Sequence, residues 1–210
     1  MTLVGKPAPD FTAKAVVGSD FVDYTLSTNW TGKKPKYTLL FFYPLDFTFV
    51  CPTEIVGFSD RVAEFQERNV QVVGVSVDSE YAHLVWTNMP RAEGGLGTIA
   101  YPLVADVKRE VATAYDVLHP DGIAFRGLFL IDQKGVVRHA LVNDLPLGRS
   151  IDEALRTIDA LQHTETHGEV CPADWKPGEK AMVAHPTQSK EYFGAVHGTP
   201  VVKAVKTKAR

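Results

Sequence analysis

The chain has 210 residues, of which 45% are apolar and 22% charged, with a net charge of −3 at pH 7. That composition supplies a hydrophobic core, excludes a wholly disordered chain and disfavours nucleic acid as the main partner. No apolar run approaches the roughly 18–20 residues of a membrane span, so we expect no membrane partner. Residues 1–14 lack the apolar stretch of a signal peptide, so we expect no cleaved signal peptide.

The first third of the chain predicts an irregular start followed by a strand and a helix. Residues 1–36 show no long period, and we interpret them as an irregular arm with short strands. The apolar run 37–43 predicts a buried strand, which Pro44 ends. Apolar residues at three- and four-residue steps then predict an amphipathic helix over 52–68.

The middle of the chain continues the alternation of strands and helices. We expect, in order, a strand at 70–77, a helix to about residue 88, a strand at 103–105 and a helix at 107–115. Asp78 or Ser79 can cap the first of these helices.

The last third predicts a hairpin, a helix and an arm. Strands at 127–131 and 136–141 flank a turn typical of antiparallel pairing, and Ser150 with Glu153 forms a capping box before a helix. Beyond residue 168 the pattern dissolves. The order of elements predicts an α/β, thioredoxin-like fold with a mixed central sheet flanked by helices. We expect a domain over 1–167 and a C-terminal arm over 168–210.

Two cysteines, Cys51 and Cys171, are present in the whole sequence. Their number excludes a disulfide-rich scaffold, a four-thiolate zinc site and a C-x-x-C redox pair. Isolated cysteines without a predicted signal peptide indicate a reducing compartment, so we expect a cytoplasmic protein. By count alone, two inert buried thiols are an alternative.

Cys51 is predicted at a helix N-terminus, because Pro52 suits the first helical position. Unpaired N–H groups and the positive end of the helix dipole stabilise negative charge there. A thiol so placed loses its proton more easily, and the thiolate is the nucleophilic form. Alternatively, Cys51 only packs beneath the helix.

The spacing P-x-x-x-T-x-x-C, within FFYPLDFTFVCPTE, resembles the active-site loop of the peroxiredoxins. Further stretches resemble the typical two-cysteine group, the alkyl hydroperoxide reductase and thioredoxin peroxidase type: GVSVDS, GGLG, FRGLFLID, VNDLPLGRS, HGEVCPADWKPG and Tyr192-Phe193. The resemblance covers nearly the whole chain. It implies an antioxidant oxidoreductase that reduces hydrogen peroxide and organic hydroperoxides to water and alcohols, in cell protection and redox homeostasis.

The resemblance also implies roles for single residues. Cys51 would be the peroxidatic nucleophile, and Cys171 would resolve its sulfenic acid as a disulfide. Arg126 would be the cation beside the thiolate, Thr48 would accept the peroxide proton and orient the bond, and Pro44 would shield the thiolate from water. The alternatives are a surface ion pair for Arg126 and a packing role for Cys171.

A second set of residues would support the site. Glu54 and Arg149 are expected to hold the first helical turn and Arg126; the alternative is a surface salt bridge of about 0–1 kcal/mol. The residues that resemble those linked to overoxidation are Gly94, Gly95, Leu96, Gly97, Tyr192 and Phe193. If the arm packs over the Cys51 helix, slow opening gives a second peroxide time to form sulfinic acid. The 17 residues after Phe193 depart from the family pattern, in which chains usually end soon after it.

Several partners follow from the resemblance. It implies a homodimer with intersubunit disulfides, often assembled into a decameric ring, although the sequence alone leaves an intrachain disulfide open. Phe47 and Phe49 are candidates for the ring contact or for the core. Thioredoxin or a flavoprotein disulfide reductase would reduce the disulfide.

No cofactor is expected. The GGLG stretch lacks the G-K-[ST] of a phosphate loop, and His163 and His167 lack an evident third metal ligand. Two other functions compete: a general disulfide oxidoreductase, which the missing C-x-x-C disfavours, and a redox-regulated holdase chaperone, which can coexist with the peroxidase.

Overall fold

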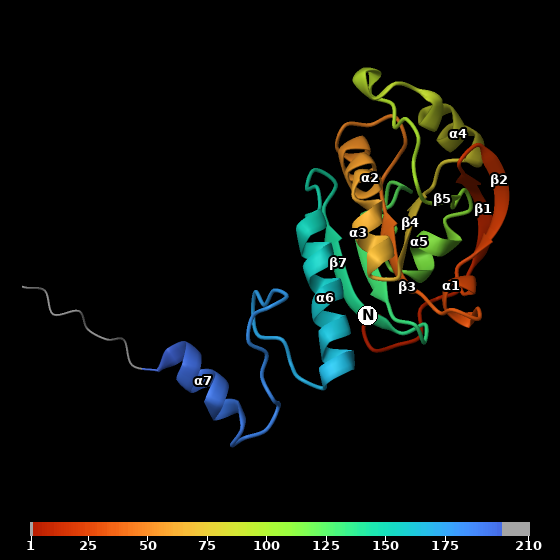
Figure 1. Ribbon diagram of the computed structural model, residues 1–210. Helices are drawn as coiled ribbons and strands as arrows, with labels where there is room; N and C mark the ends of the chain where they lie inside the picture. Colours follow the sequence, from red (N-terminus) through yellow and green to blue (C-terminus); the bar gives the residue numbers. More distant parts are fainter. Residues whose placement is uncertain (1, 199–210) are drawn as a thin grey trace, which may run out of the picture. The chain divides into compact units, whose positions relative to one another are not determined.

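A mixed sheet of seven strands organises the part of the chain that the structure, a computed structural model, describes, residues 2–198 (Figure 1). Its order is β2-β1-β5-β4-β3-β6-β7. The strands are β1 Thr12–Val17, β2 Asp20–Thr25, β3 Tyr37–Phe42, β4 Val70–Ser76, β5 Leu103–Ala105, β6 Arg126–Ile131 and β7 Val137–Asn143. Strand β4 is parallel to β3 and β5, and the other neighbours are antiparallel.

Helices cover both faces of this sheet. The helices of the described residues are α1 Thr28–Thr31, α2 Val50–Asp60, α3 Val62–Glu67, α4 Glu80–Asn88, α5 Glu110–Ala114, α6 Ile151–His167 and, in the second compact unit described below, α7 Ser189–His197, with a 3-10 turn at Arg91–Glu93. Adjacent residues of a strand point to opposite faces. On β3, Phe41 stacks on Phe58 of α2 at 4.9 Å between ring centroids, whereas Phe42 packs against Tyr115 just after α5. Helices α2 and α5 therefore lie on opposite faces, and every residue of β3 and β6 is buried between the layers.

The architecture confirms the predicted thioredoxin-like α/β fold. The strands predicted at 37–43, 70–77 and 103–105 are β3, β4 and β5, and the two strands near the turn at 132–135 form the antiparallel pair β6 and β7. The predicted cap of α4 is Ser79, whose side chain accepts a hydrogen bond from the Ala82 N–H.

The N-terminal segment is more regular than the irregular arm that its sequence predicts. Strands β1 and β2 form a hairpin that extends the central sheet, since β1 pairs with β5 through Ala15 opposite Val104. Ala15 and Val16 are buried, but β2 is an edge strand with half or more of its residues exposed to water. An edge strand needs no strict apolar alternation, so this sequence pattern is weak.

The helix predicted over 52–68 is also different in detail. It begins at Val50 and is interrupted at Arg61, whose backbone leaves the helical conformation at φ −106° and ψ 15°. Phe58 and Phe65 pack against each other across the interruption, so the apolar period continues although the helix does not. Pro52 is the third helical residue, where its missing N–H still removes no helical hydrogen bond.

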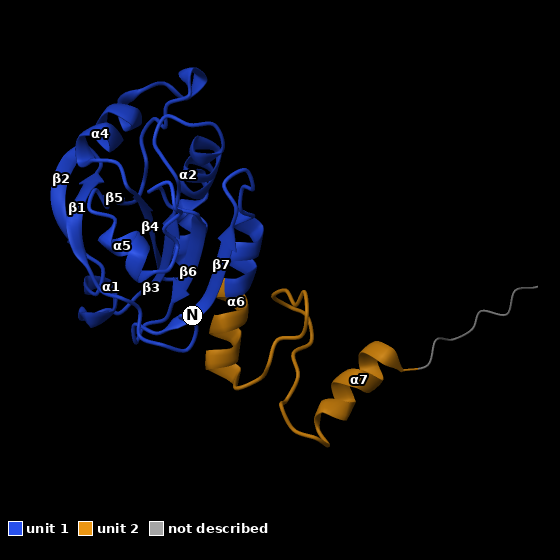
Figure 2. Cartoon of the chain, turned by 180° about the vertical axis from the view of Figure 1, so that it is seen from behind, with its two compact units in different colours: residues 1–157 blue, residues 158–210 orange. Residues whose placement is uncertain are grey.

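The chain divides into two compact units, residues 1–157 and residues from 158 onward (Figure 2). The dividing point lies inside α6, ten residues before the boundary at 167/168 that the sequence suggests, which is where α6 ends. The second unit holds the end of α6, an isolated β-bridge between Val170 and Met182, and α7. Residues 199–210, with the basic C-terminus, lie outside the described residues. Within those described, no helix has both the length and the apolar character needed to cross a bilayer.

Candidate active site

Cys51 is the second residue of α2 and is fully buried. The loop between β3 and α2 leads to it, and this loop carries the buried Pro44 and the half-buried Thr48. The Thr48 hydroxyl donates a hydrogen bond to the Leu45 carbonyl at 2.9 Å. The sulfur is therefore placed at the start of a helix, as predicted, where backbone N–H groups favour negative charge.

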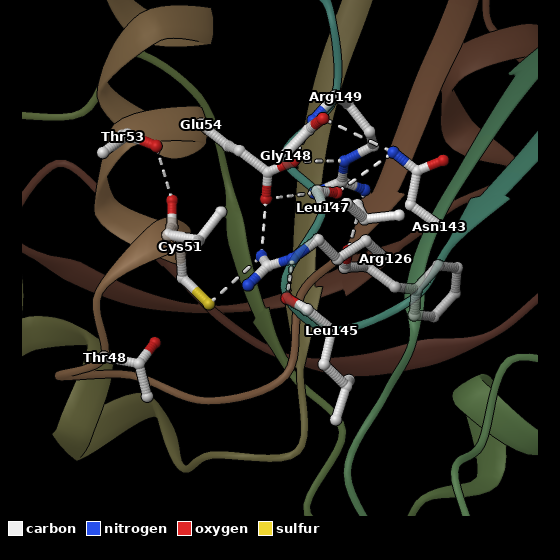
Figure 3. A network of polar contacts seen from close by, with 12 residues as sticks. Thr48, Cys51, Thr53, Glu54, Arg126, Asn143, Leu145, Leu147, Gly148 and Arg149 are labelled. Carbon is white, nitrogen blue, oxygen red and sulfur yellow. Dashed lines mark hydrogen bonds and ion pairs between the residues drawn. The ribbon is translucent and has the colours of Figure 1, made fainter.

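Arg126 brings a positive charge to this sulfur. It is the first residue of β6, and its Nη1 lies 3.4 Å from Cys51 Sγ (Figure 3). The same Nη1 donates to Glu54 Oε2 at 2.7 Å, and Nε donates to the Leu145 carbonyl at 2.7 Å. Arg126 is 3% exposed, so the alternative of a surface ion pair is wrong.

Glu54 and Arg149 form a buried support behind the guanidinium of Arg126. Glu54 accepts hydrogen bonds from the backbone N–H, Nε and Nη2 of Arg149, all between 2.7 and 2.9 Å. Arg149 Nη1 also donates to the carbonyls of Phe42 and Gly127, which joins α2 to strands β3 and β6. Their side chains are 2% and 1% exposed, so this is no ordinary surface salt bridge.

The charges of this cluster do not balance without the sulfur. Arg126 and Arg149 carry two positive charges, and Glu54 carries one negative charge, all buried. Buried charge is costly unless it is paired. An anionic sulfur on Cys51 would neutralise the group of four residues, which is the state that a nucleophilic cysteine requires.

Thr48 and Arg126 flank the Cys51 sulfur in the close view of the site (Figure 3). The structure thus brings Thr48, Cys51 and Arg126 together at the junction of the β3–α2 loop, α2 and β6, while Pro44 is buried at the start of the same loop. All four were singled out from the sequence.

Cys171 belongs to the second compact unit and is a partly exposed free thiol. Its Sγ lies 3.5 Å from the Ala160 carbonyl and 3.8 Å from the Thr164 hydroxyl, both on α6. Nearby on α6, His163 contacts Glu169 through Nε2 at 3.0 Å and packs against the Trp175 ring. Cys171 therefore contacts the C-terminal part of α6 through two long polar contacts of its sulfur.

The residues linked to overoxidation fall in both units. The GGLG segment follows the 3-10 turn in the first unit; Leu96 is fully buried, and Trp86 Nε1 donates to the Gly94 carbonyl at 2.8 Å. Tyr192 and Phe193 lie on α7 in the second unit, where Phe193 is 47% exposed.

Sequence reasoning missed a buried polar cluster directly under the β3–α2 loop. Tyr43, Asp46 and His83 share hydrogen bonds there, and the side chains of Asp46 and His83 have no exposed surface. The signal was available, because Tyr43 and Asp46 lie inside the FFYPLDFTFVCPTE motif. His83, however, lies 37 residues further along the chain than Asp46, and only the fold joins them.

Comparisons with known proteins agree with this geometry. The AhpC/TSA family model matches residues 4–140, and the C-terminal domain of 1-Cys peroxiredoxin matches residues 160–195. Peroxiredoxin-2 from Bos taurus is 59% identical over 191 residues, covering 90% of this chain and 94% of the relative. The chloroplastic 2-Cys peroxiredoxin BAS1 from Hordeum vulgare is 55% identical over 197 residues, covering 93% and 92%. The reduced crystal structure of Plasmodium vivax 2-Cys peroxiredoxin superimposes with a TM-score of 0.83 at 50% identity, covering 87% of this chain and 93% of that one.

Proposed function

This chain belongs to the AhpC/TSA family of peroxiredoxins, which are thiol peroxidases, and on that premise we propose that Cys51 attacks the hydroperoxide and Cys171 resolves the product. The observation that carries the first half is the 3.4 Å contact between Arg126 Nη1 and the buried Cys51 Sγ at the start of α2.

In the first step the Cys51 thiolate attacks one peroxide oxygen, so that an S–O bond forms and the O–O bond breaks. The sulfur is oxidised by two electrons to the sulfenic acid, and the departing oxygen takes a proton and leaves as water or alcohol. Arg126 stabilises the negative charge that develops on the departing oxygen, because its guanidinium offers several fixed donors.

Thr48 orients the peroxide. Its hydroxyl proton is engaged by the Leu45 carbonyl at 2.9 Å, so its oxygen is left to accept a hydrogen bond from the peroxide O–H. Pro44, which is buried beside the loop, keeps bulk water from the thiolate. Glu54 and Arg149 hold Arg126 and the first turn of α2 in register.

In the second step the Cys171 thiol condenses with the Cys51 sulfenic acid, which forms a disulfide and releases water. We assign the two sulfurs to different subunits of a homodimer, and a dithiol protein, thioredoxin or a flavoprotein disulfide reductase, then reduces the disulfide. Phe47 and Phe49 are 50% and 92% exposed beside the site, which supports a contact between dimers in a decameric ring.

The GGLG segment and Tyr192-Phe193 are the elements that would slow disulfide formation in this scheme. While they delay the opening of the Cys51 helix, a second peroxide can oxidise the sulfenic acid to sulfinic acid. Support comes from the buried Leu96, which ties the GGLG segment to the core of the first unit.

Replacing each of the two cysteines in turn tests this function. Cys51→Ser should abolish peroxide consumption, whereas Cys171→Ser should consume one equivalent of peroxide per chain and then stop in a coupled assay with thioredoxin. Normal turnover by Cys51→Ser would refute the assignment. A non-reducing gel of the oxidised wild type should show a band at twice the chain mass, and a monomer band alone would indicate an intrachain bond.

The role of Arg126 has its own test with a matched control. Arg126→Lys should slow oxidation of Cys51 by hydrogen peroxide by about 10²-fold or more, because a lysine loses the planar set of donors. Arg61→Lys makes the same change in a partly exposed ion pair with Glu64, away from Cys51, and should leave the rate unchanged. Equal rates for both variants would contradict the role given to Arg126.

A further inference from the structure

The loop that carries Thr48 is bound to the core through the hydrogen bonds of Asp46. Its backbone N–H donates to Asp78 Oδ2 at 2.9 Å, and Asp78 in turn accepts from the Ser76 hydroxyl at the end of β4. Its carboxylate accepts from the Tyr43 hydroxyl at 3.0 Å and contacts His83 Nδ1 at 2.8 Å. Asp46 as a whole residue is 6% exposed, so these contacts take the place of hydrogen bonds to water.

One peptide unit links the hydrogen bonds of Asp46 to Thr48. The N–H of the Leu45–Asp46 peptide is the group bound by Asp78, and the C=O of the same peptide accepts the Thr48 hydroxyl hydrogen bond. A peptide unit is planar and moves as one body. Any change in how Asp46 is held therefore turns the carbonyl that sets the direction of the Thr48 hydroxyl.

The loop needs such fastening because its next residue is strained. Phe47 has φ +57°, in the left-handed region that a residue with a Cβ rarely adopts. Its ring packs against Trp86 on α4, with ring centroids 5.5 Å apart, but Phe47 remains 50% exposed. The strained conformation persists only while neighbouring contacts hold it.

The geometry of His83 shows that the fastening depends on a proton. His83 is completely buried on α4, and both of its ring nitrogens face oxygen: Nδ1 faces Asp46, and Nε2 faces the Val104 carbonyl on β5 at 3.2 Å. Each of these two contacts needs one hydrogen atom to be a hydrogen bond. In the contact between Nδ1 and Asp46, that hydrogen can be carried by Nδ1 or by the carboxyl group. A neutral imidazole beside a carboxylate supplies only one hydrogen, so loss of a proton leaves one contact unmade.

We propose that the Tyr43–Asp46–His83 cluster positions the peroxide-binding loop, and that loss of one proton from it loosens the loop and slows the reaction of Cys51 with peroxide. His83 is thus a positioning residue that acts through Asp46 and Thr48. The inference rests on the proposed role of Thr48 in holding the peroxide.

The surroundings of His83 favour the protonated form of the cluster. Burial by itself lowers the pKa of His83, but the Asp46 carboxylate, the Val104 carbonyl and the charge of Asp78 outweigh it, and the pKa is raised above the ordinary 6.5. Tyr43 adds no competing charge, since burial and the neighbouring Asp46 raise its pKa well above 10. The loop is therefore held below the raised pKa of His83 and released as the pH rises through that pKa.

The test is the rate constant for oxidation of Cys51 by hydrogen peroxide, followed by stopped flow on the reduced full-length protein from about pH 5.5 to 9.5. The wild type should show a decline on the alkaline side. His83→Gln should be about tenfold slower at pH 7, since small misplacements are costly, and should lose the alkaline decline. Asp46→Asn should keep the decline but shift it to lower pH. The control His185→Gln, an exposed histidine of the second unit, should match the wild type.

Thr48→Val separates this inference from the proposed function. In that background His83→Gln should slow the reaction much less than it does in the wild type, because the two residues act on one contact. Three results would each overturn the positioning role of His83. They are a wild-type rate that does not decline at alkaline pH, a His83→Gln pH profile of unchanged shape, and independent effects of the two substitutions in the double variant. If Thr48→Val alone reacts at the wild-type rate, the proposed function of Thr48 fails instead. Should His83→Gln not fold, the shift in Asp46→Asn decides.

Discussion

Glu54→Gln should be among the most destabilising single isosteric changes in this protein. The carboxylate accepts four hydrogen bonds from two buried guanidinium groups and a backbone N–H, and it carries the negative charge between Arg126 and Arg149. The amide keeps the shape but turns an N–H₂ group toward donors and leaves two buried cations without a carboxylate. Removing one partner from a buried ion pair typically costs about 3–5 kcal/mol.

This loss can be measured by urea unfolding of the reduced protein at one fixed protein concentration, because association also contributes to stability. At roughly 2–4 °C per kcal/mol for a chain of this size, the thermal midpoint should fall by about 6–20 °C. Oxidation of Cys51 by peroxide should slow as well, since Arg126 loses the contact that holds it beside the sulfur.

The matched control is Glu64→Gln, which makes the same chemical change in the partly exposed ion pair with Arg61. Water screens that pair, so its loss should be small compared with that of Glu54→Gln. Equal losses of unfolding free energy in the two variants would refute the reasoning, because burial would then not be what makes the Glu54 charge matter.

Three further changes test other parts of the fold. Burial lowers the pKa of His139 below its ordinary 6.5, so the unfolded chain binds the proton more readily, and the unfolding free energy should rise with pH up to about 6.5. His139→Gln should flatten that part of the stability curve measured in urea, and an unchanged slope would contradict it. Ser79→Ala removes the acceptor for the Ala82 N–H and should cost about 1 kcal/mol of unfolding free energy, which Ser79→Asp should largely retain. Gly95→Ala would place a Cβ against the Met89 backbone and should cost about 1–3 kcal/mol, with faster amide exchange over 91–97; unchanged exchange would show that the segment adapts.

Local sequence signals were sufficient for several parts of this protein. The run that becomes β3 has no charged residue to place in water, so it predicts a strand covered on both faces, as found. The spacing of Pro44, Thr48 and Cys51 likewise depends on neighbours in the chain, and the structure places Thr48 beside the Cys51 sulfur. Arg126 was identified because its motif resembles that of a known family; its position in the sequence alone favoured a surface ion pair.

The sequence was less informative wherever a contact joins distant segments. The β1–β2 hairpin has a weak pattern, because the edge strand β2 is stabilised by pairing with β1, which in turn pairs with β5, rather than by its own alternation. The interruption at Arg61 was hidden, because Phe58 and Phe65 keep the apolar period on both sides of it.

By itself, then, the sequence determined the family and the order of the elements after residue 36, and it named Cys51 as the candidate nucleophile, since these depend on short-range periodicity and on a contiguous motif. Only the tertiary structure decided the electrostatics: that Glu54 lies between two buried guanidinium groups, and that Asp46 meets a histidine from another helix. Charge interactions depend on distance and burial in space, and neither quantity can be obtained from positions along a chain.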